Sequence, residues 1–347
     1  MKKLILLCVS LLSLSAIGIT AMASFKISQM QSETLPLSLP LYIDIEKGES
    51  VNSLASRLEA MGIVDSAFWI KLLVRFDYIS PAIKAGEYVV DSPVTLIDLF
   101  SVFATGDVVH YQITFPEGWT LQQVVQELSR HPKLEQTITD ENVKDIPEKL
   151  GVTGSAEGWI FPDTYRYIKG DQDISILRRA REVMQKTLTV AWEGRSLSNL
   201  SSAIETPYDA LILASLIERE TSVGAERGTI SSVFHNRLNV GMKLQTDPTV
   251  IYALGEAYDG NIRRSDLRVD SPYNTYRYRG LPPTPIAMPG KDSILAALNP
   301  AQTKYIFFVA KGDGHHQFSE TLQEHNRAVQ NYQIKKRKEN YKSTPGK

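Results

Sequence analysis

Residues 208–221 read YDALILASLIERET, and this stretch decides the fold of the larger part of the chain. Positions 211–217 are apolar except for Ser215, so almost no polar face is left and the pattern predicts a helix buried on all sides. The run ends in two glutamates, Glu218 and Glu220. Residues two apart on a helix point about 200° apart, so these two carboxyl groups cannot form a facing pair. Periodicity alone does not decide which of them would do chemistry.

Two interpretations of the glutamates stay open at this point. A carboxyl group at the end of an apolar helix loses hydration, which raises its pKa and suits it to act as a general acid near neutral pH. Alternatively, both glutamates only cap the helix or form ion pairs, for instance with Arg219 or Arg227.

Several segments downstream combine rigid turns with amides and aromatic rings. Proline fixes turn geometry, and Asn and Gln offer paired donors and acceptors that suit the hydroxyls and amides of sugars. The segments are Asn236-Arg237-Leu238, 244–252 (LQTDPTVIY), 271–276 (SPYNTY), 280–283 (GLPP), 314–318 (GHHQF) and Glu324-His325-Asn326.

Residues 157–165 (EGWIFPDTY) place aromatic rings beside carboxylates. A ring can stack on the apolar face of a sugar while carboxylates accept its hydroxyls. A buried turn with aromatic rings in the core explains the same residues, and the sequence does not choose between the two.

The part before residue 137 holds a weak internal repeat. Residues 42–45 and 111–115 alternate like strands, and Ser50 and Thr120 then stand where a side-chain oxygen caps the start of a helix. The pattern after residue 48 resembles the LysM glycan-binding module, although a capped helix after a strand also serves as a plain structural platform. Further elements are expected at 84–90 (strand), 95–103 (helix), 137–154 (loop with a short helix), 173–192 (helix) and 230–238 (helix).

The amino-terminal segment predicts a membrane anchor. Lys2 and Lys3 precede a run without charge from residue 4 to 24, long enough to cross a bilayer, which needs about 20 residues. The lysines favour a cytoplasmic amino terminus. Residues 21–23 (AMA) also resemble a signal-peptide cleavage site, so a cleaved leader is the alternative.

Composition limits the function classes. The chain has 347 residues and a net charge of −1, so the basic excess typical of nucleic-acid binders is missing apart from a short run near residue 336. Its one cysteine, Cys8, permits no internal disulfide and no Cys/His metal cluster, and no metal site or cofactor is expected.

Taken together in this order, the motifs 214–221, 236–238, 244–249, 273–276 and 280–283 closely resemble the MltG family of endolytic murein transglycosylases, also called YceG-like proteins. The resemblance runs from about Tyr42 to Tyr332 and includes 157–159 and the late His316. One departure is Thr284, where the resemblance predicts glycine.

The resemblance implies cleavage of the MurNAc–GlcNAc β-1,4 bond within peptidoglycan strands, with 1,6-anhydro-MurNAc ends that terminate growing strands. The C6 hydroxyl of the substrate attacks its own C1, so one acid/base residue is enough. The resemblance assigns this role to Glu218 and predicts that Glu220 matters much less. Substrate-binding candidates are Gln245, Asp247, Asn274, Tyr276, His316, Glu324 and Asn326.

The expected architecture is an α+β fold in five parts. They are a cytoplasmic stub and transmembrane helix (1–24), a linker (25–40), a LysM-like α+β subdomain (41–109), a larger mixed α+β catalytic domain (110–335) and a basic tail (336–347). The catalytic domain would lie in the periplasm at the inner membrane, with glycan strands as substrate and peptidoglycan synthases (penicillin-binding proteins) as partners. Two other functions are weighed: a non-catalytic LysM-type binding protein, and a two-carboxylate muramidase that yields reducing ends.

Overall fold

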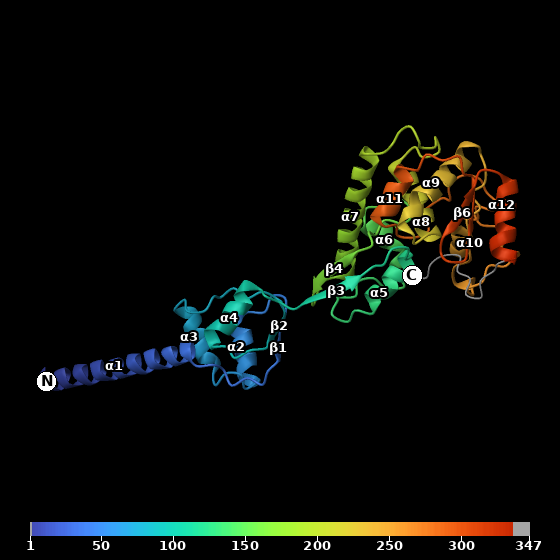
Figure 1. Cartoon of the computed structure of the whole chain (residues 1–347). Coiled ribbons are helices and arrows are strands. Elements are labelled where there is room, and N and C mark those ends of the chain that lie inside the picture. The colour runs from blue at the N-terminus through green and yellow to red at the C-terminus, as the bar shows by residue number, and fades with distance from the viewer. Residues whose placement is uncertain (1, 336–347) are drawn as a thin grey trace. The chain divides into compact units, whose positions relative to one another are not determined.

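The computed structural model of the protein describes residues 2–335, with the side chains of residues 2–9, 12 and 335 left out, so the expected basic tail lies outside the described residues. The chain divides into two compact units. Residues up to Tyr111 together with Tyr167–Asp171 form the first, and Gln112–Arg166 with the residues from Gln172 onward form the second. Helices and small two-stranded sheets alternate along the chain (Figure 1), which is the expected α+β class.

The first unit is built around an antiparallel pair of strands, in which Ile43 lies opposite Tyr88. Both side chains are buried in a core formed by this sheet and three helices. The elements follow the order β1 (Leu41–Ile45), α2 (Val51–Ala60), α3 (Ala67–Arg75), β2 (Gly86–Val90) and α4 (Leu96–Thr105).

Side-chain caps start these helices, and the one at Ser50 is predicted by the sequence. Ser50 accepts a hydrogen bond from the Ser53 amide at the start of α2, and Thr95 accepts one from the Asp98 amide at the start of α4. Helix α3 is an addition to the predicted elements. It begins after Ser66, whose side chain accepts from the Phe68 amide, so a cap of the same kind marks its start.

The amino-terminal segment forms α1 (Lys2–Ser32). Among the described residues, no helix combines the length and the apolar character needed to cross a membrane. The expected linker at 25–40 is wrong in its first half, because α1 runs through it to Ser32. The physical reason is that residues 25–32 contain neither proline nor glycine, so nothing in them stops a helix.

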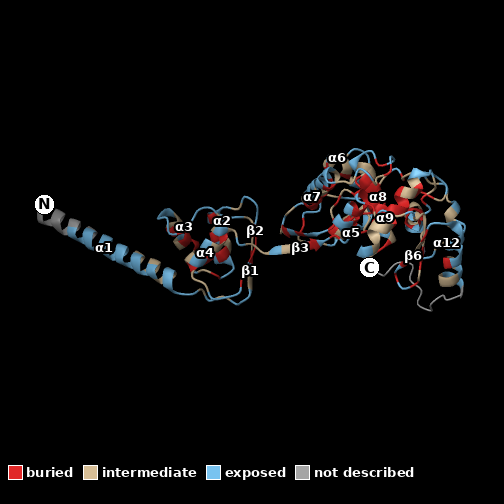
Figure 2. Ribbon diagram, turned by 45° about the horizontal axis from the view of Figure 1, so that its top comes forward, coloured by how far each residue is buried: buried red, intermediate tan, exposed pale blue. Residues whose placement is uncertain are grey.

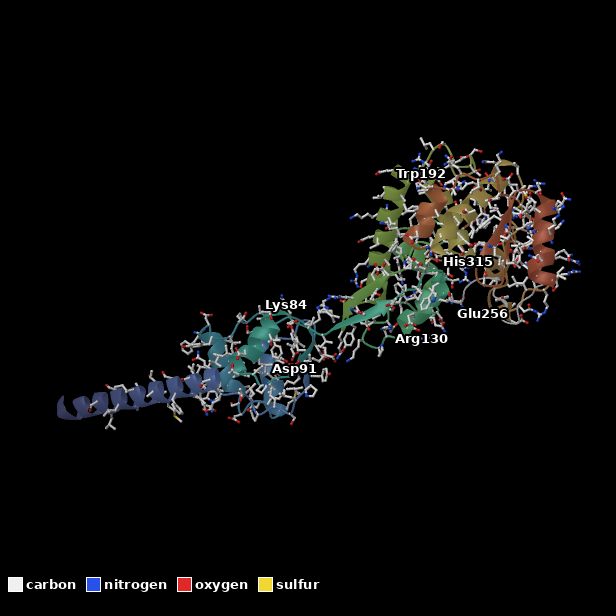
Figure 3. All side chains as sticks on the ribbon, viewed as in Figure 1. Lys84, Asp91, Arg130, Trp192, Glu256 and His315 are labelled. Atoms are coloured by element: carbon white, nitrogen blue, oxygen red, sulfur yellow. The ribbon has the colours of Figure 1, made fainter. Side chains whose placement is uncertain are left out.

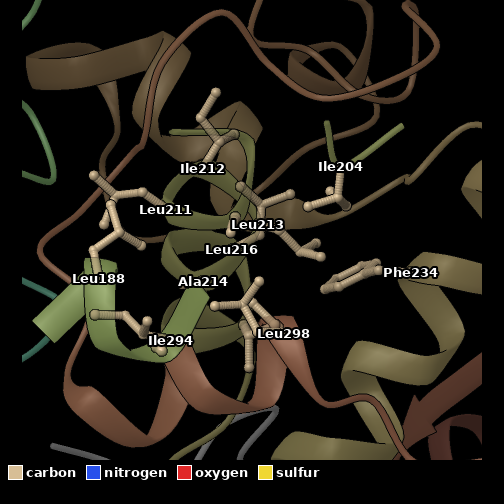
Figure 4. Packing of buried hydrophobic residues seen from close by; sticks show 14 of the residues in the cluster. Leu188, Ile204, Leu211, Ile212, Leu213, Ala214, Leu216, Phe234, Ile294 and Leu298 are labelled. Carbon is tan, nitrogen blue, oxygen red and sulfur yellow. The ribbon is translucent and has the colours of Figure 1, made fainter. Parts of the chain in front are cut away.

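The second unit is centred on α8 (Pro207–Glu220), which contacts α7 (Asp173–Glu193), α9 (Gly224–Asn239), α10 (Asp247–Leu254) and α11 (Lys291–Leu298). Every residue of α8 from 210 to 218 is buried, so the prediction of a helix covered on all sides is confirmed. Figure 4 shows Leu188 of α7, Phe234 of α9 and Leu298 of α11 gathered around it, and Figure 2 shows the same centre as buried.

Smaller elements surround this core. The strands β5 (Phe307–Ala310) and β6 (His316–Ser319) are antiparallel, with Ala310 opposite His316. A capping box at Thr120, also predicted, opens α5. The remaining elements are β3 (His110–Thr114), α5 (Leu121–Ser129), η1 (Val143–Asp145), α6 (Ile146–Lys149), β4 (Thr164–Ile168), η2 (Gly255–Ala257), η3 (Asp266–Arg268), α12 (Leu322–Val329) and η4 (Gln330–Lys335).

Candidate active site

A cavity of about 540 Å³ opens in the second unit where α8 ends. Its walls come from the last turn of α8, the first turn of α10, residues 258–262, strands β5 and β6, and α12. Titratable and amide side chains line it, among them Glu220, Arg237, Asp247, His316 and His325. The motifs that the sequence separates by more than a hundred residues therefore meet around one space.

Glu220 is the carboxyl group that α8 presents to this cavity. Its side chain is partly buried and accepts a short hydrogen bond from the Thr246 hydroxyl. Burial raises the pKa of Glu220 to about 7, the Thr246 hydrogen bond opposes this, the negative charge of Asp247 adds to it, and Arg237 and Arg219 oppose it. A carboxyl group in this state can give and take a proton near neutral pH.

Glu218 lies in the core instead. Only 1% of its surface is exposed, and it is not among the residues that line the cavity. It accepts hydrogen bonds from the Gly290 amide at 3.2 Å and from the Ser293 hydroxyl at 2.7 Å. One turn earlier, Ser215 accepts from the Ile286 amide at 3.0 Å. This face of α8 therefore packs against residues 286–293, and of the two glutamates Glu220 lines the cavity. The role that the resemblance gives to Glu218 stays a prediction.

Three polar cavity residues meet at the start of α10: Gln245 in the turn before it, Asp247 in its first turn, and Tyr276 from a later loop. Gln245 lines the cavity with a backbone φ of 49°, in the left-handed region that most side chains avoid. The Tyr276 hydroxyl donates to the Asp247 carboxylate at 2.6 Å, and both side chains line the cavity. The structure thus brings the predicted residues Gln245, Asp247 and Tyr276 together with Glu220.

Arg237 holds the turn before α10 in place. Only 6% exposed, it donates from Nε to the Ile306 carbonyl at 2.7 Å and from Nη1 to the Leu244 carbonyl at 2.5 Å. Desolvation lowers the pKa of Arg237, while the negative charge of Glu220 raises it. A buried guanidinium beside the cavity supplies positive charge to the Glu220 side of the site.

His316 reaches the cavity from the first residue of β6. Glu226 of α9 holds it twice, because the carboxylate accepts the His316 amide at 3.0 Å and contacts ring Nδ1 at 2.8 Å. Phe308 packs edge-on against the same ring. His325 stacks on Phe307 and also lines the cavity.

Three predicted binding residues are not part of this cavity lining. Asn274 is fully buried and donates to the carbonyls of Leu267 and Val269, so it holds a loop together. Glu324 closes the capping box that starts α12. Asn326 lines a separate surface depression along α12 and η4. The binding roles that the resemblance gives these three residues stay predictions.

Other cavity residues were missed from the sequence. Glu220, Arg237 and His325 line the cavity, although the resemblance gives Glu220 little weight and the motifs assign no role to the other two. Thr246 bonds to Glu220 from the LQTDPT segment, again without a role assigned from the sequence. The signal that could have found them is their presence within those segments.

Thr284 stands where the resemblance predicts glycine. Its hydroxyl lies 2.9 Å from the Tyr273 hydroxyl and donates to the Pro285 carbonyl at 2.8 Å. The Thr284 side chain thus holds the loop after the two prolines in place. Threonine instead of the expected glycine changes a contact within this loop and removes no residue that lines the cavity.

Comparisons with known proteins identify relatives of the whole chain. The model of the YceG-like family matches residues 43–331. An endolytic murein transglycosylase of Bacillus subtilis (strain 168) is 32% identical over 308 residues, 84% of each chain. An endolytic murein transglycosylase of Streptococcus pneumoniae (strain ATCC BAA-255 / R6) is 27% identical over 322 residues, 83% of this chain and 57% of that protein.

A solved structure is similar as well. The crystal structure of a yceG-like protein from Listeria monocytogenes aligns with a TM-score of 0.53 at 30% identity, covering 83% of this chain and 98% of that one. The resemblance inferred from the motifs is thereby confirmed, and the chain belongs to the YceG-like family.

Proposed function

We propose that the protein is an endolytic lytic transglycosylase that cuts peptidoglycan glycan strands, with Glu220 as its single acid/base residue. The names of its relatives in Bacillus subtilis and Streptococcus pneumoniae support the activity. The observation that carries the assignment of the residue is the position of Glu220 in the cavity, with a pKa of about 7, while Glu218 is 1% exposed in the core.

The reaction needs one residue that first donates a proton and then accepts one. Protonated Glu220 gives its proton to the glycosidic oxygen, and the bond from that oxygen to C1 of N-acetylmuramic acid breaks. The C6 hydroxyl oxygen of the same sugar bonds to C1, and its proton returns to Glu220. No water is consumed, one product ends in a 1,6-anhydro ring and the other in a free hydroxyl. The attack is intramolecular, so the enzyme need not position a second reactant.

The remaining cavity residues have roles in holding and stabilising. The hydroxyl of Thr246 keeps the Glu220 carboxyl in place. Gln245, Asp247 and Tyr276 are our candidates for contacts with the distorted ring, and the Asp247 carboxylate is suited to stabilise positive charge that develops at C1. His316, oriented by Glu226, offers a further polar contact.

Two matched variants test the assignment of the acid. Glu220→Gln keeps the shape of the side chain but cannot deliver the proton, so release of anhydro-ended muropeptides from purified strands should fall about 10²–10⁴-fold. Glu218→Gln should keep most of the activity, because the change lies in the core. Thermal melts of both variants establish that they are folded.

Three results would count against the proposal. Full activity of Glu220→Gln would show that Glu220 is not the acid/base residue. Loss of activity only in a folded Glu218→Gln variant would assign that role to Glu218. Reducing ends that carry solvent oxygen would identify a muramidase instead, and mass spectrometry of the products distinguishes the two chemistries. Binding without any product would identify a non-catalytic module.

We also propose that α1 anchors the protein in the inner membrane, with both units in the periplasm near peptidoglycan synthases. Support comes from Lys2 and Lys3 before an uncharged run that extends to residue 24. Protease added to spheroplasts should degrade the chain, and the protein should sediment with membranes. A soluble form that begins near Ser24 would instead establish a cleaved leader.

A further inference from the structure

A second cavity of about 540 Å³ lies next to the first. Arg219, Pro248 and Ile251 line both cavities, so these three residues form the division between them. Arg219 is held across this boundary because its Nη1 donates to the Gly118 carbonyl at 3.0 Å. The two cavities are therefore neighbouring compartments of the second unit and meet at the last turn of α8.

The walls of the second cavity carry groups that suit a sugar. Gln122 and Gln123 of α5 supply amides, Thr120 a hydroxyl, Tyr252 an aromatic ring and Glu157 a carboxyl group. Amides and carboxylates pair with sugar hydroxyls, and a ring stacks on the apolar face of the sugar. The Glu157-Gly158-Trp159 motif, which the cleavage chemistry leaves without a role, supplies one of these groups.

Glu157 and Tyr252 are fixed in place at this site. Glu157, 4% exposed, accepts the Leu121 amide at 3.0 Å and the Tyr252 hydroxyl at 3.2 Å. The following Gly158 has a φ of 81°, and a Cβ there would come within 2.5 Å of Pro285. The turn is thus rigid, and binding groups held rigid lose little entropy when a ligand arrives.

At the rim, the amide Nε2 of Gln122 donates to the Glu256 carboxylate at 3.2 Å. The two residues come from α5 and η2, and both are exposed (Glu256 is labelled in Figure 3). Because neither side chain belongs to the core, both can be changed without removing a buried contact.

We infer that the second cavity binds sugar residues of the same glycan strand that is cut in the first, on one side of the broken bond. This inference rests on the proposed function, since it takes the first cavity as the place of cleavage. An endolytic enzyme must hold a strand on both sides of the cut, and a compartment that shares three wall residues with the active-site cavity is placed to do so. The occupant is therefore the GlcNAc–MurNAc polymer.

The test fills the second cavity from its rim. Gln122→Trp places a bulky ring at the cavity, while Gln126→Trp, one turn further along α5 and also exposed but outside the cavity lining, is the matched control. Both variants are assayed on purified uncrosslinked glycan strands of defined lengths, with circular dichroism to verify folding.

We expect Gln122→Trp to raise KM on long strands about tenfold, equivalent to about 1.4 kcal/mol of binding, with kcat and cleavage of the shortest cleavable oligosaccharide little changed. Gln126→Trp should match the wild type. Equal KM values on long strands for both variants would overturn the inference. A change confined to kcat in Gln122→Trp would overturn it as well, because the cavity would then not contribute to strand binding.

A binding experiment separates this inference from the proposed function. In the Glu220→Gln background, calorimetry with long strands should show about tenfold weaker binding when Gln122→Trp is added, and no change with Gln126→Trp. If Glu220→Gln were fully active, the catalytic assignment would fail while the two tryptophan variants would still report on the second cavity. If Glu220→Gln is inactive and adding Gln122→Trp leaves its affinity for long strands unchanged, only the inference about the second cavity fails.

Discussion

Glu220 has an environment in which burial and hydrogen bonding act in opposite directions. Desolvation is the larger effect and raises its pKa to about 7, although the Thr246 hydroxyl and two arginines favour the charged form. The residue is therefore held near the midpoint of its titration at neutral pH, where proton donation and acceptance are both possible.

This pKa predicts how activity depends on pH. The first step uses protonated Glu220, so the rate should fall as pH rises past about 7. Glu157 also has a pKa raised to about 7, chiefly by burial, and must be separated from it. The pH profile of kcat should therefore be measured for the wild type and for Glu157→Gln. A Glu157→Gln variant that loses the fall above pH 7 would move the titration from Glu220 to Glu157.

Stability should depend on pH in the same window. The folded pKa of Glu220 lies above its ordinary value of 4.5, so its contribution to folding is fully present below about 4.5 and is lost as pH rises through about 7. Glu220→Gln should therefore gain stability relative to the wild type between pH 4.5 and 8, as measured by thermal melts. A constant difference across this range would contradict the raised pKa.

At this scale the sequence predicts that two glutamates point apart, but not which one faces a substrate. The segment 286–293, which lies far along the chain, packs on the face of α8 that carries Glu218. Local periodicity contains no information on that packing. The resemblance assigns the acid/base role to Glu218, whereas the contacts of the two glutamates lead us to propose Glu220.

Among the elements, the turn from α9 to α10 is the most constrained part of the site. Its Gln245 has a φ of 49°, and the left-handed region costs a side chain about 1–2 kcal/mol. Strain of this kind is kept where the surroundings hold the backbone in place. Here the Gln245 amide donates to the Thr275 carbonyl at 3.2 Å, and Arg237 binds the preceding Leu244 carbonyl.

We predict that Gln245→Gly keeps or raises stability, by up to about 1 kcal/mol, because glycine adopts positive φ without a clash. Activity should fall, since the side-chain amide leaves the cavity. Asp77→Gly is the matched control, because Asp77 of the first unit also has a positive φ, of 61°, and lies outside the cavity. A clear drop in the melting temperature of Gln245→Gly would make the side chain structural.

Elements with a local signal were predictable and others were not. Helices α2, α4 and α5 begin after the N-cap residues Ser50, Thr95 and Thr120. Such a helix start is visible in the sequence because a cap involves only three or four neighbouring residues. The strands β5 and β6 were not assigned as strands, although they bring His316 beside Ala310 and so into the cavity. Pairing between strands is a tertiary property, which a single segment does not reveal.

For the whole molecule, the division into two units bears on where the candidate site lies. All residues that line the two cavities belong to the second unit. The boundary after Tyr111 lies near the expected one at residue 110, but the return of Tyr167–Asp171 to the first unit was not anticipated. Composition does not reveal that a segment so far along the chain joins the first unit.

A protein that begins near Tyr111 should therefore still cut glycan strands, at a reduced rate, if it folds. Loss of residues 41–109 removes the partners of Tyr167–Asp171 in the first unit, so folding must be verified by circular dichroism. The same fragment with Glu220→Gln is the control. A folded fragment without product would place part of the chemistry in the first unit, and unchanged strand-length preference would mean that the first unit does not position the substrate.

The end of α8 at Glu220 has one more consequence. Peptide dipoles add along a helix, so its carboxyl end bears a partial negative charge. A carboxylate there is repelled by its own helix, whereas the neutral acid is not. The backbone of α8 thus acts in the same direction as burial and favours the protonated form of Glu220 before any sugar enters. Part of the resting enzyme therefore already carries the catalytic proton on Glu220, so binding of a strand need not first protonate this residue.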